Sequence, residues 1–570
     1  MRLDILVLHG AKLRYGCVIG VLLIGLVSAS VVSASGSVGS KGMVVSASSE
    51  ASRVGLDILM AGGNAVDSAV AVGFALSVTY PEAGNLGGGG FAVIRLPTGE
   101  VMTLDHREQA PLASRPDQFL DDSGQYDPDK ALYSHLASGT PGSVDGLLRL
   151  HERFGRLPRE AVLAPAIELA ESGFRLSDVL ASRLRDLVAG VPDRPATVAK
   201  FSTPSGPLKG GDLWRQPDLA RTLRTISKEG AAGFYTGWVA DAIVAEMKRG
   251  GGLIAQGDLD GYVSVWREPV HGRYRGFDVY SMGPPSSGGI LLVQMLNMLE
   301  AFDVASLPLG NAELIHLMTE VERRAYADRA EHLGDPDFWP VPQQALTDTD
   351  YAAARMKSFN PERASSSDDV GHGLVFPESE QTTHFSVIDS DGMMVSLTTT
   401  LNSSFGSQWV VPGTGILLNN EMDDFAASAK SANQYGLLGN AANAIEPRKR
   451  MLSSMSPTIV MKSGQPYLIT GSPGGSTIIT TVLQVIVNMI DHGLDLEAAV
   501  RRPRIHHQWR PDVIYFGPNA ISPSALEALR AMGHELEQRP PMGDANSISI
   551  HSGVFTGFAD PREGGAALGY

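Results

Sequence analysis

The stretch TTHFSVIDSDGMMVSLTTTLN, Thr382–Asn402, alternates polar and apolar residues, breaks at Asp391-Gly392 and then alternates again. Two alternating runs around an Asp-Gly pair predict a β-hairpin. The stretch also begins with two threonines and carries three more near its end. Because threonine fits the pleated surface of a sheet, ordinary β-structure explains this composition. The alternative is that one threonine is a nucleophile and that the chain is cut beside it.

The sequence on both sides of this hairpin predicts an α+β fold. Downstream, SPTIVMKSGQPYLITGS repeats the hairpin pattern, and GGSTIITTVLQVIVNMI is typical of a buried helix that begins at a glycine turn. Upstream, FAVIRL (Phe91–Leu96) and the following VMTLDHRE predict a pair of strands. Residues 44–78, 145–260 and 312–330 show mainly helical spacing of apolar side chains. Strand pairs together with helices indicate a layered architecture.

The size and charge of the chain limit its class. With 570 residues it is too long for one ordinary hydrophobic core, so we expect two modules or one large two-part fold. A hydrophobic content of 43% supports a globular protein with a substantial core. The formal net charge of −16 argues against nucleic acid or an anionic membrane surface as a partner, because both bind basic patches.

The N-terminal segment, residues 1–34, has the pattern of a secretory signal peptide. Basic residues precede an apolar run from Cys17 to Val27, and small residues follow as far as Ala34. The alternative is a retained membrane anchor, because residues 17–34 are near the lower length limit for spanning a bilayer. Cys17 is the sole cysteine, so removal of the segment leaves neither a disulfide nor a thiol nucleophile. These features predict a periplasmic or secreted bacterial protein.

Chemistry at a threonine requires a base beside its hydroxyl, which is a poor nucleophile at neutral pH. A free α-amine is such a base, and it lies on the same residue when threonine is the first of its chain. Thr382 becomes a first residue if its hydroxyl attacks the carbonyl of Gln381 and the peptide bond breaks. The polar, turn-rich residues 358–380 suit an internal linker that leads to such a cut.

Other catalytic motifs are missing from the sequence, which has no G-x-x-x-x-G-K-[ST] phosphate loop and no G-x-S-x-G nucleophile elbow. The glycines of GNLGGGGF predict a tight turn where backbones approach closely. His506 and His507 are adjacent and do not share one face of an element, which argues against a metal site there. The sequence therefore implies neither a metal nor an organic cofactor.

With these motifs in view, the chain after its leader resembles the γ-glutamyltranspeptidases of the N-terminal-nucleophile hydrolase superfamily. TTHFSVIDSDGMMVSLTTTLNSSFG carries the resemblance most densely. It implies a four-layer αββα sandwich, made as one precursor that cuts itself between Gln381 and Thr382. Residues 35–381 then form a large subunit and residues 382–570 a small catalytic subunit, so that the two make a heterodimer.

The resemblance also implies roles for particular residues. Thr382 matches the catalytic threonine, and Thr400 matches the threonine whose hydroxyl positions the new terminal amine. Arg107, in LDHREQAP, matches the arginine that pairs with the α-carboxylate of the γ-glutamyl donor, for which a planar guanidinium is well suited. The remaining matches hold the charged α-carbon end of that donor, the first three by receiving its ammonium group: Asn402, Glu421, Asp424, Ser453 and Ser454.

Two glycines predict where negative charge is stabilised. In GSPGGSTIITTVLQ, Gly474 and Gly475 come just before a predicted helix. Backbone N–H groups at a helix start are unpaired and lie at the positive end of the helix dipole, which suits a tetrahedral oxyanion. The alternative is a plain turn at which the helix begins.

The resemblance implies cleavage of the γ-glutamyl amide bond of glutathione and related compounds, with transfer to water or to an amino acid or dipeptide. SAKSANQYGLLGNAANA matches a lid loop, with Tyr435 as its gating aromatic, and the lid together with Asp424 favours amino-acid donors. One alternative is an acylase for glutaryl-cephalosporins from the same superfamily. Another is a γ-glutamyl-binding protein that cuts itself but turns over little.

Overall fold

Two seven-stranded antiparallel sheets form the middle of the protein. The computed structural model describes residues 36–371, 382–426 and 441–570. The proposed leader, Gln381 and Tyr435 lie outside these described residues. Within the described ranges, no helix is both long enough and apolar enough to cross a membrane.

The first sheet contains the hairpin that the sequence predicts. β12 (Thr382–Asp389) pairs with β13 (Met394–Thr400), and the turn between them contains Asp391-Gly392. The hairpin prediction is therefore confirmed. The strand order of this sheet is β23-β2-β12-β13-β3-β4-β9. Its other strands are β23 (Ala566–Gly569), β2 (Gly42–Ser46), β3 (Gly89–Arg95), β4 (Val101–Asp105) and β9 (Val265–Arg267).

The second sheet has the order β1-β22-β21-β17-β16-β11-β10. Its centre is the predicted second hairpin, which turns at Ser463-Gly464, so that prediction is also confirmed. Its strands are β1 (Gly36–Gly39), β22 (Val554–Phe558), β21 (Ser547–His551), β17 (Gln465–Thr470), β16 (Thr458–Lys462), β11 (Phe277–Ser281) and β10 (Val270–Tyr274).

A buried apolar layer joins the two sheets face to face. The first sheet contributes Met43, Val45, Ile388 and Met394, among others. The second contributes a matching set: Ile459, Met461, Ile469, Ile548 and Phe555. Strands that are covered on both faces bury almost every side chain, as β12 and β13 do.

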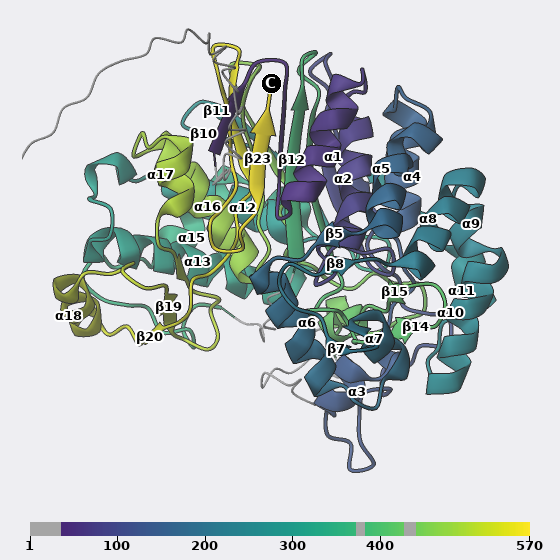
Figure 1. The fold of residues 1–570 in the computed structure, drawn as a ribbon. Helices are drawn as coiled ribbons and strands as arrows, with labels where there is room; N and C mark the ends of the chain where they lie inside the picture. The colour runs from purple at the N-terminus through teal and green to yellow at the C-terminus, as the bar shows by residue number, and fades with distance from the viewer. Residues whose placement is uncertain (1–35, 372–381, 427–440) are drawn as a thin grey trace, which may run out of the picture. The chain divides into compact units, whose positions relative to one another are not determined.

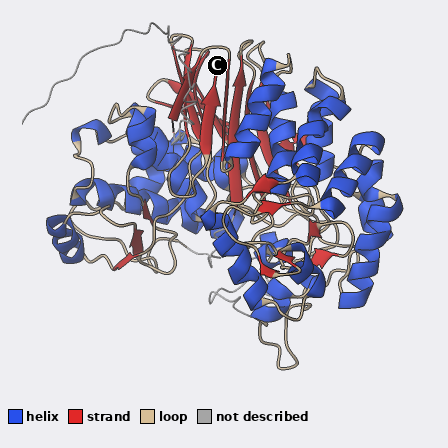
Figure 2. Ribbon diagram, viewed as in Figure 1, coloured by secondary structure: helices blue, strands red, loops and turns tan. Residues whose placement is uncertain are grey.

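Helices cover the outer face of each sheet and complete four layers (Figures 1 and 2). On the first sheet lie α1 (Ser49–Met60), α2 (Ala65–Thr79) and α4 (Ser143–Phe154), while α5 (Arg159–Ser172) packs on α2 and α8 (Pro217–Glu229) packs on α5. On the second lie α12 (Gly288–Leu299), α13 (Ala312–His332), α15 (Thr349–Met356), α16 (Thr477–Ile490) and α17 (Leu496–Arg501). The predicted αββα sandwich is thus confirmed.

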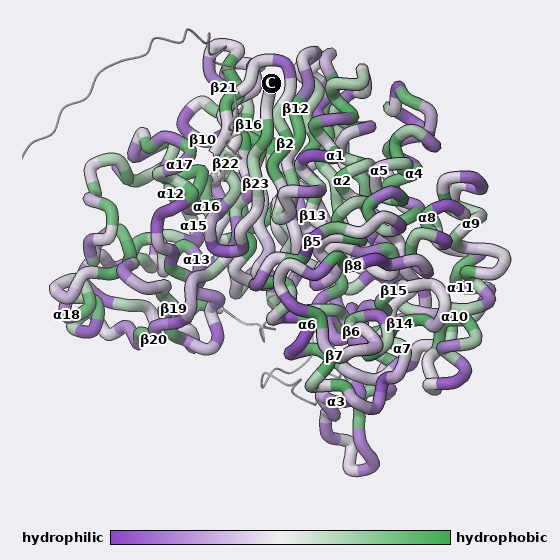
Figure 3. Tube along the Cα trace, in the orientation of Figure 1, coloured by the Kyte–Doolittle hydropathy of each residue, from purple (hydrophilic) through white to green (hydrophobic). Residues whose placement is uncertain are grey.

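Smaller elements surround these layers. Helices between α5 and β9, and near the C-terminus, are α6 (Asp178–Gly190), α7 (Pro195–Lys200), α9 (Ala232–Tyr235), α10 (Gly237–Gly250), α11 (Gln256–Gly261) and α18 (Pro523–Met532). A three-stranded sheet holds β18 (Ile505–His506), β19 (Ile514–Phe516) and β20 (Leu536–Gln538). In Figure 3 the hydrophobic colours run along the central strands and the helices that cover them.

The sequence analysis placed residues 44–78 in helices, and the start of that range is wrong. Val44 and Val45 belong to β2, which pairs with β12 on one side and β23 on the other. The two helices that follow are present, and α2 is buried on every side. Its N-terminus is fixed by a capping box in which Asn64 and Asp67 satisfy each other's backbone N–H groups.

Each sheet contains strands from both sides of the predicted cut. In the first, β12, β13 and β23 from after residue 381 lie among four strands from before it. In the second, β10, β11 and β1 flank four strands from the later part of the chain. The two predicted subunits are therefore parts of one folded unit rather than two separate modules.

Candidate active site

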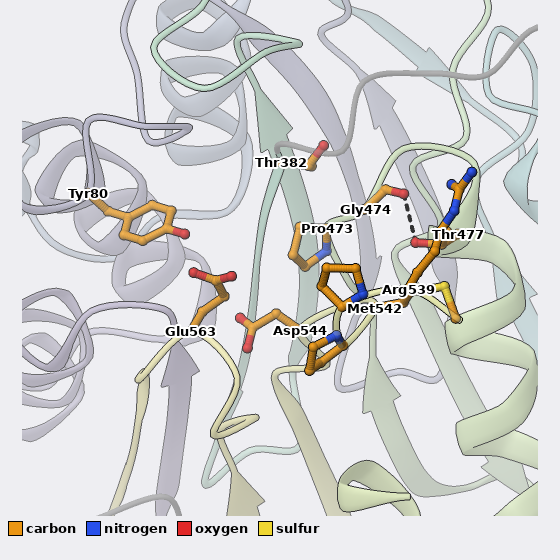
Figure 4. A pocket seen from close by; sticks show the side chains of 12 residues that line it. Tyr80, Thr382, Pro473, Gly474, Thr477, Arg539, Met542, Asp544 and Glu563 are labelled. Atoms are coloured by element: carbon orange, nitrogen blue, oxygen red, sulfur yellow. Dashed lines mark hydrogen bonds between the residues drawn. The ribbon is translucent and has the colours of Figure 1, made fainter. Parts of the chain in front are cut away.

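Thr382 is the first residue of β12, an interior strand of the first sheet. Its Cα lies opposite that of Thr400 in the β12–β13 ladder, and its Oγ1 lies 3.5 Å from Thr400 Oγ1. Thr400 Oγ1 also accepts a hydrogen bond from the backbone N–H of Asn402, at 2.8 Å. Thr382 is 5% exposed and lines a cavity of about 110 Å³ (Figure 4). The predicted nucleophile is thus buried in a sheet but accessible through a pocket.

The glycines of GNLGGGGF allow the start of β3 to approach the end of β13 closely. A Cβ atom on Gly88 would lie 2.0 Å from the carbonyl oxygen of Thr400, and one on Gly90 would lie 2.2 Å from that of Thr398. Asn85 donates to the Thr400 carbonyl at 2.8 Å and accepts from Gly88 N–H. The interpretation of these glycines as a site of close backbone approach is confirmed.

Gly474 and Gly475 lie just before α16, as expected. Both have positive φ, +127° and +53°, and a Cβ atom on Gly474 would lie 2.4 Å from Thr477 Oγ1. Among the described residues, neither glycine N–H donates a hydrogen bond. Gly474 lines the same cavity as Thr382. The turn therefore offers unpaired N–H groups at the positive end of a helix, next to the hydroxyl.

Arg107 lies on the other side of Thr400, two residues after β4. Its guanidinium donates to the carboxylates of Glu421 and Asp424, which lie in a 3₁₀ turn from Glu421 to Asp424. It also donates to the carbonyl of Met451, from Nε, at 3.3 Å. All three charged side chains are buried. The residues that the sequence analysis assigned to opposite ends of a bound amino acid thus pair with one another in the structure.

This pairing has a direct electrostatic explanation. A buried charge without a partner is costly, so opposite charges that are buried together neutralise each other. A zwitterion that enters can take over both halves of the interaction, because its carboxylate replaces the acids at Arg107 and its ammonium replaces Arg107 at the acids. The site is therefore suited to a ligand that carries both charges on one carbon.

The remaining predicted residues also lie at this end of the sheet. Asn402, with φ of +74°, donates from its side chain to the carbonyl of Asn420 at 2.9 Å. Ser454 Oγ accepts from Arg329 at 3.3 Å, and Ser453 Oγ accepts from the N–H of Met455 at 3.1 Å. Both serines are buried. The roles assigned to these residues stay predictions.

Glu108 is a buried acid that the sequence analysis did not single out. Its carboxylate lies 3.8 Å from Arg107 Nη1, and neither of its oxygens has a hydrogen-bond partner among the described residues. Burial raises the pKa of Glu108 to about 7, and Arg107 opposes that shift. Its position next to Arg107 in LDHREQAP was the available sequence signal.

The cavity beside Thr382 has further walls that the sequence analysis missed. Tyr80, Asp544 and Glu563 line it, and Arg539 and Met542 contribute to it from the segment after β20. These residues come from three separate stretches of the chain, around residues 80, 539–544 and 563. Their proximity to Thr382 is therefore visible only in the fold.

The adjacent histidines have ordinary partners. His506 lies 2.9 Å from Thr480 Oγ1, and His507 lies 3.2 Å from Asp512. Within the described ranges, one group has metal-like spacing: His316, Glu320 and His534. Glu320 already pairs with Arg323 and Arg324, and the two histidine rings bond each other at 2.7 Å. This group is a satisfied hydrogen-bond network.

Comparison with known proteins agrees with this geometry. A γ-glutamyltranspeptidase family model matches residues 51–570. The glutathione hydrolase proenzyme of Escherichia coli (strain K12) is 49% identical over 525 residues, which cover 92% of this chain and 90% of that protein. The solved cephalosporin acylase of Bacillus halodurans has a TM-score of 0.83 and 27% identity, covering 94% of this chain and 97% of that chain.

A solved γ-glutamyltranspeptidase chain from Helicobacter pylori is 41% identical with a TM-score of 0.56, and it covers 56% of this chain and 93% of that chain. The resemblance expected from the sequence is thereby confirmed, and so is the N-terminal-nucleophile type of fold. The chain belongs to the γ-glutamyltranspeptidase family.

Proposed function

We propose that this protein cleaves the γ-glutamyl amide bond of glutathione and related compounds and passes the γ-glutamyl group to water, an amino acid or a dipeptide. The observation that carries the proposal is the position of Thr382. Its hydroxyl lies close to Thr400 and to the turn whose Gly474 and Gly475 N–H groups are unpaired among the described residues, and β13, β3 and β4 lead from it to Arg107. The family membership and the glutathione hydrolase proenzyme of E. coli support the same reaction.

Maturation comes first, since the α-nitrogen of Thr382 is an amide in the uncut chain. Thr382 Oγ1 attacks the carbonyl carbon of Gln381, the C–N bond breaks, and the hydroxyl proton passes to the departing nitrogen. Water then hydrolyses the resulting ester. This leaves a carboxylate on Gln381 and both a free hydroxyl and a free amine on Thr382. The products are a heterodimer of residues 35–381 and residues 382–570.

Turnover uses the same hydroxyl with its own amine as the base. Oγ1 attacks the γ-carbonyl carbon of the substrate and its proton moves to the α-amine. The N–H groups of Gly474 and Gly475 hold the oxyanion. The C–N bond then breaks, and the α-ammonium gives its proton to the leaving nitrogen. Water or an acceptor amine attacks the γ-glutamyl ester in the second half, gives a proton to the α-amine, and releases Oγ1 as the hydroxyl.

The pairing of Arg107 with Glu421 and Asp424 favours a donor with a free α-amino acid end. A glutaryl group has a distal carboxylate but no ammonium, so it satisfies Arg107 and leaves two buried carboxylates without a cation. Because the chain is also similar to a solved cephalosporin acylase, the acylase is the alternative that the experiment must distinguish. We expect faster release from γ-glutamyl-p-nitroanilide than from glutaryl-p-nitroanilide, and the reverse order would favour the acylase.

The N-terminal segment supports export. Residues 1–34 have the composition of a secretory signal, and the periplasm or the exterior of a bacterium is the location we propose. Glutathione, γ-glutamyl compounds and amino-acid or dipeptide acceptors are the small-molecule partners. N-terminal sequencing of the mature large subunit distinguishes a cleaved signal from a retained anchor.

The decisive experiment replaces Thr382 by alanine and compares it with Thr383→Val. Thr383 is the next residue of the same strand, its side chain lies on the opposite face, and its buried hydroxyl has no partner among the described residues. Thr382→Ala should give one uncut chain and no p-nitroaniline from γ-glutamyl-p-nitroanilide. Thr383→Val should be cut and active. Normal cutting of Thr382→Ala, seen by gel electrophoresis, would overturn the proposal.

Titration of the active site distinguishes an enzyme from a self-cleaving binding protein with little turnover. A glutamine-analogue electrophile labels Thr382 once per active site, so the labelled fraction gives the number of competent sites. Turnover per labelled site of about 1 s⁻¹ or more, the lower end of ordinary enzymes, supports catalysis. Full labelling with turnover far below that rate would support the binding protein instead.

A further inference from the structure

A cavity of about 420 Å³ lies between α7, the start of α8 and the hairpin of β14 (Val410–Val411) and β15 (Ile416–Leu417). It shares no lining residue with the cavity beside Thr382. Figure 1 shows α7 next to β14, and Thr197 on α7 accepts from the N–H of Val410 at 3.1 Å. Its volume is in the usual range for small-molecule sites, about 300 to 1,000 Å³. We call this cavity the α7–α8 pocket.

Apolar side chains make most of the wall of the α7–α8 pocket. Residues 196–208 and 213–219, from before the predicted cut, form one part of it, and residues 410–415, from after the cut, form the other. A wall of this kind stabilises the apolar body of a ligand by removing it from water. The apolar members include Leu208, Leu213, Trp214, Leu219, Val410 and Pro412.

Lys200 brings a positive charge into this apolar wall. Its ammonium donates to Gln216 Oε1 and to the carbonyl of Gly415, each at 2.8 Å, and all three residues line the pocket. The same ammonium lies 5.9 Å from the ring centroid of Trp214. Both hydrogen-bond acceptors are neutral groups. Because an ammonium has three N–H donors, one remains for a ligand.

The charge of Lys200 is not neutralised by the protein. Within the described ranges, no carboxylate forms an ion pair with its ammonium. The other charged lining residues are Arg215 and Asp218, so the lining has a net positive charge when Lys200 is protonated. Burial lowers the pKa of Lys200 to about 7, and the charge of Asp218 opposes that shift. A lysine in this state gains most from an anion that enters the pocket.

The hydrogen bonds of Lys200 also join α7 to the turn before β15, which is a structural role. That role alone does not explain a charged residue at this position. A neutral amide donor would serve the same two acceptors without the cost of burying an ammonium. The charge therefore indicates a ligand in addition to a cross-link.

We propose that the α7–α8 pocket binds an organic acid with an apolar body, whose carboxylate pairs with Lys200 and whose hydrocarbon part lies against Trp214 and Val410. The chemical class is a monocarboxylate such as a medium-chain fatty acid, and binding is non-covalent. A neutral molecule of the same shape leaves the ammonium without an anion, and a second charge at the far end would be buried in the apolar wall. The site is separate from the reaction at Thr382 and does not depend on the proposed function.

The test compares binding of octanoate and octanamide to the purified protein by isothermal titration calorimetry. The two probes have the same chain length and differ in charge. At about pH 6.5 octanoate should bind about tenfold more tightly than octanamide, as expected for a hydrogen bond between charged groups. Equal affinities, or no binding of octanoate at millimolar concentration, would overturn the inference.

Variants of two lining residues locate the ligand. Lys200→Met should abolish the preference for octanoate over octanamide, and Lys200→Arg should keep it. Leu213, which is 43% exposed, lies where a substitution does little to the core, and Leu213→Gln should weaken both probes about fivefold. Val179→Gln is the matched control, because Val179 is an exposed apolar residue of α6 outside the pocket.

Either of two results would overturn the inference. Wild-type affinity for octanoate in Leu213→Gln would place the ligand elsewhere. A preference for octanoate that persists in Lys200→Met would separate the ligand from the ammonium. If Lys200→Met fails to fold, Leu213→Gln and the pH dependence of binding still decide the question.

The pH dependence follows from the charge of Lys200. The protonated amine is the form that pairs with a carboxylate, so the Kd of octanoate should rise up to about tenfold per pH unit above about pH 7. The Kd of octanamide should change little over the same range. Lys200→Arg stays charged and should bind octanoate without this dependence. A Kd for octanoate that is constant from about pH 6 to about pH 9 in the wild-type protein would contradict the pairing with Lys200.

Discussion

Thr382 and Thr400 face each other at the open end of the β12–β13 ladder, with their hydroxyl oxygens 3.5 Å apart. That separation is at the outer limit of a hydrogen bond. Thr400 is held in place by the N–H of Asn402, and its backbone carbonyl is held by Asn85. A fixed hydroxyl at this position can orient the amine that appears on Thr382 after the cut.

Thr400→Val should therefore slow turnover about a hundredfold, the usual effect of losing a group that positions a general base. Thr400→Ser, which keeps the hydroxyl, should stay within about tenfold of wild type. The measurement is kcat for γ-glutamyl-p-nitroanilide on protein that is fully cut, as judged on a gel. Equal rates for the valine and serine variants would show that the hydroxyl has no role.

Arg107→Lys should weaken donor binding more than it slows chemistry. Lysine keeps the charge but loses the planar fork that contacts both Glu421 and Asp424, and that would contact a substrate carboxylate. We expect KM for γ-glutamyl-p-nitroanilide to rise about tenfold to a hundredfold. The control is Arg149→Lys, since Arg149 forms a half-exposed helical pair with Asp145. An unchanged KM in Arg107→Lys would argue against contact with the donor.

Gly474→Ala should lower kcat with little change in KM. Alanine is strained at φ +127°, and its Cβ would lie 2.4 Å from Thr477 Oγ1, so the turn and its N–H groups must move. Loss of one oxyanion contact costs about 10²- to 10³-fold in kcat. Gly464→Asn is the matched control, because Gly464 also has positive φ but a Cβ there meets nothing within 4 Å. A large fall in the melting temperature of Gly474→Ala that accompanies the fall in kcat would indicate a folding defect instead.

Glu108 predicts a particular pH dependence of stability. Its folded-state pKa is about 7 and that of the unfolded chain is near 4.5. The contribution of the protonated carboxyl to the free energy of unfolding is fully present below the pKa of Glu108 in the unfolded chain. It is lost as the pH rises through the folded-state pKa of about 7. Glu108→Gln removes this loss, so the variant should gain stability relative to wild type between about pH 5 and about pH 8. The upper limit of that gain is about 3 kcal/mol.

Melting temperatures of wild type and Glu108→Gln across that pH range test the assignment. Glu152→Gln, an exposed residue of α4, should follow wild type at every pH. Parallel curves for wild type and Glu108→Gln would mean that Glu108 does not titrate in this range.

The sequence predicted the parts of the fold that local pattern controls. The Asp391-Gly392 and Ser463-Gly464 turns lie between strongly alternating runs, and both hairpins form where they were expected. The helix from Ala312 is present because Asn311 caps it and its apolar residues recur at helical spacing. Val44 and Val45 were assigned to a helix because a fully buried strand has no alternation, and only its pairing with β12 and β23 reveals it.

The donor side of the site was predictable because its residues lie in recognisable motifs, whereas the walls of the cavity beside Thr382 were not. Tyr80, Asp544 and Glu563 are far apart in the sequence and carry no motif. The linker prediction was also incomplete, because Ser367 is buried and donates to the carbonyl of Trp509. Residues 372–380 of that linker lie outside the described residues. Long-range packing decides such features, and local composition does not encode it.

The presence of strands from before and after residue 381 in both sheets has a consequence for the mature protein. Separating the two polypeptides would require β12 and β23 to leave β2, β13 to leave β3, β22 to leave β1 and β16 to leave β11, which amounts to unfolding the whole molecule. Activity per mole should therefore not fall on dilution, and mixing the products of two separate genes for the two halves should not restore it without refolding. The backbone nick creates a chain end while the protein continues to behave, mechanically, as one piece.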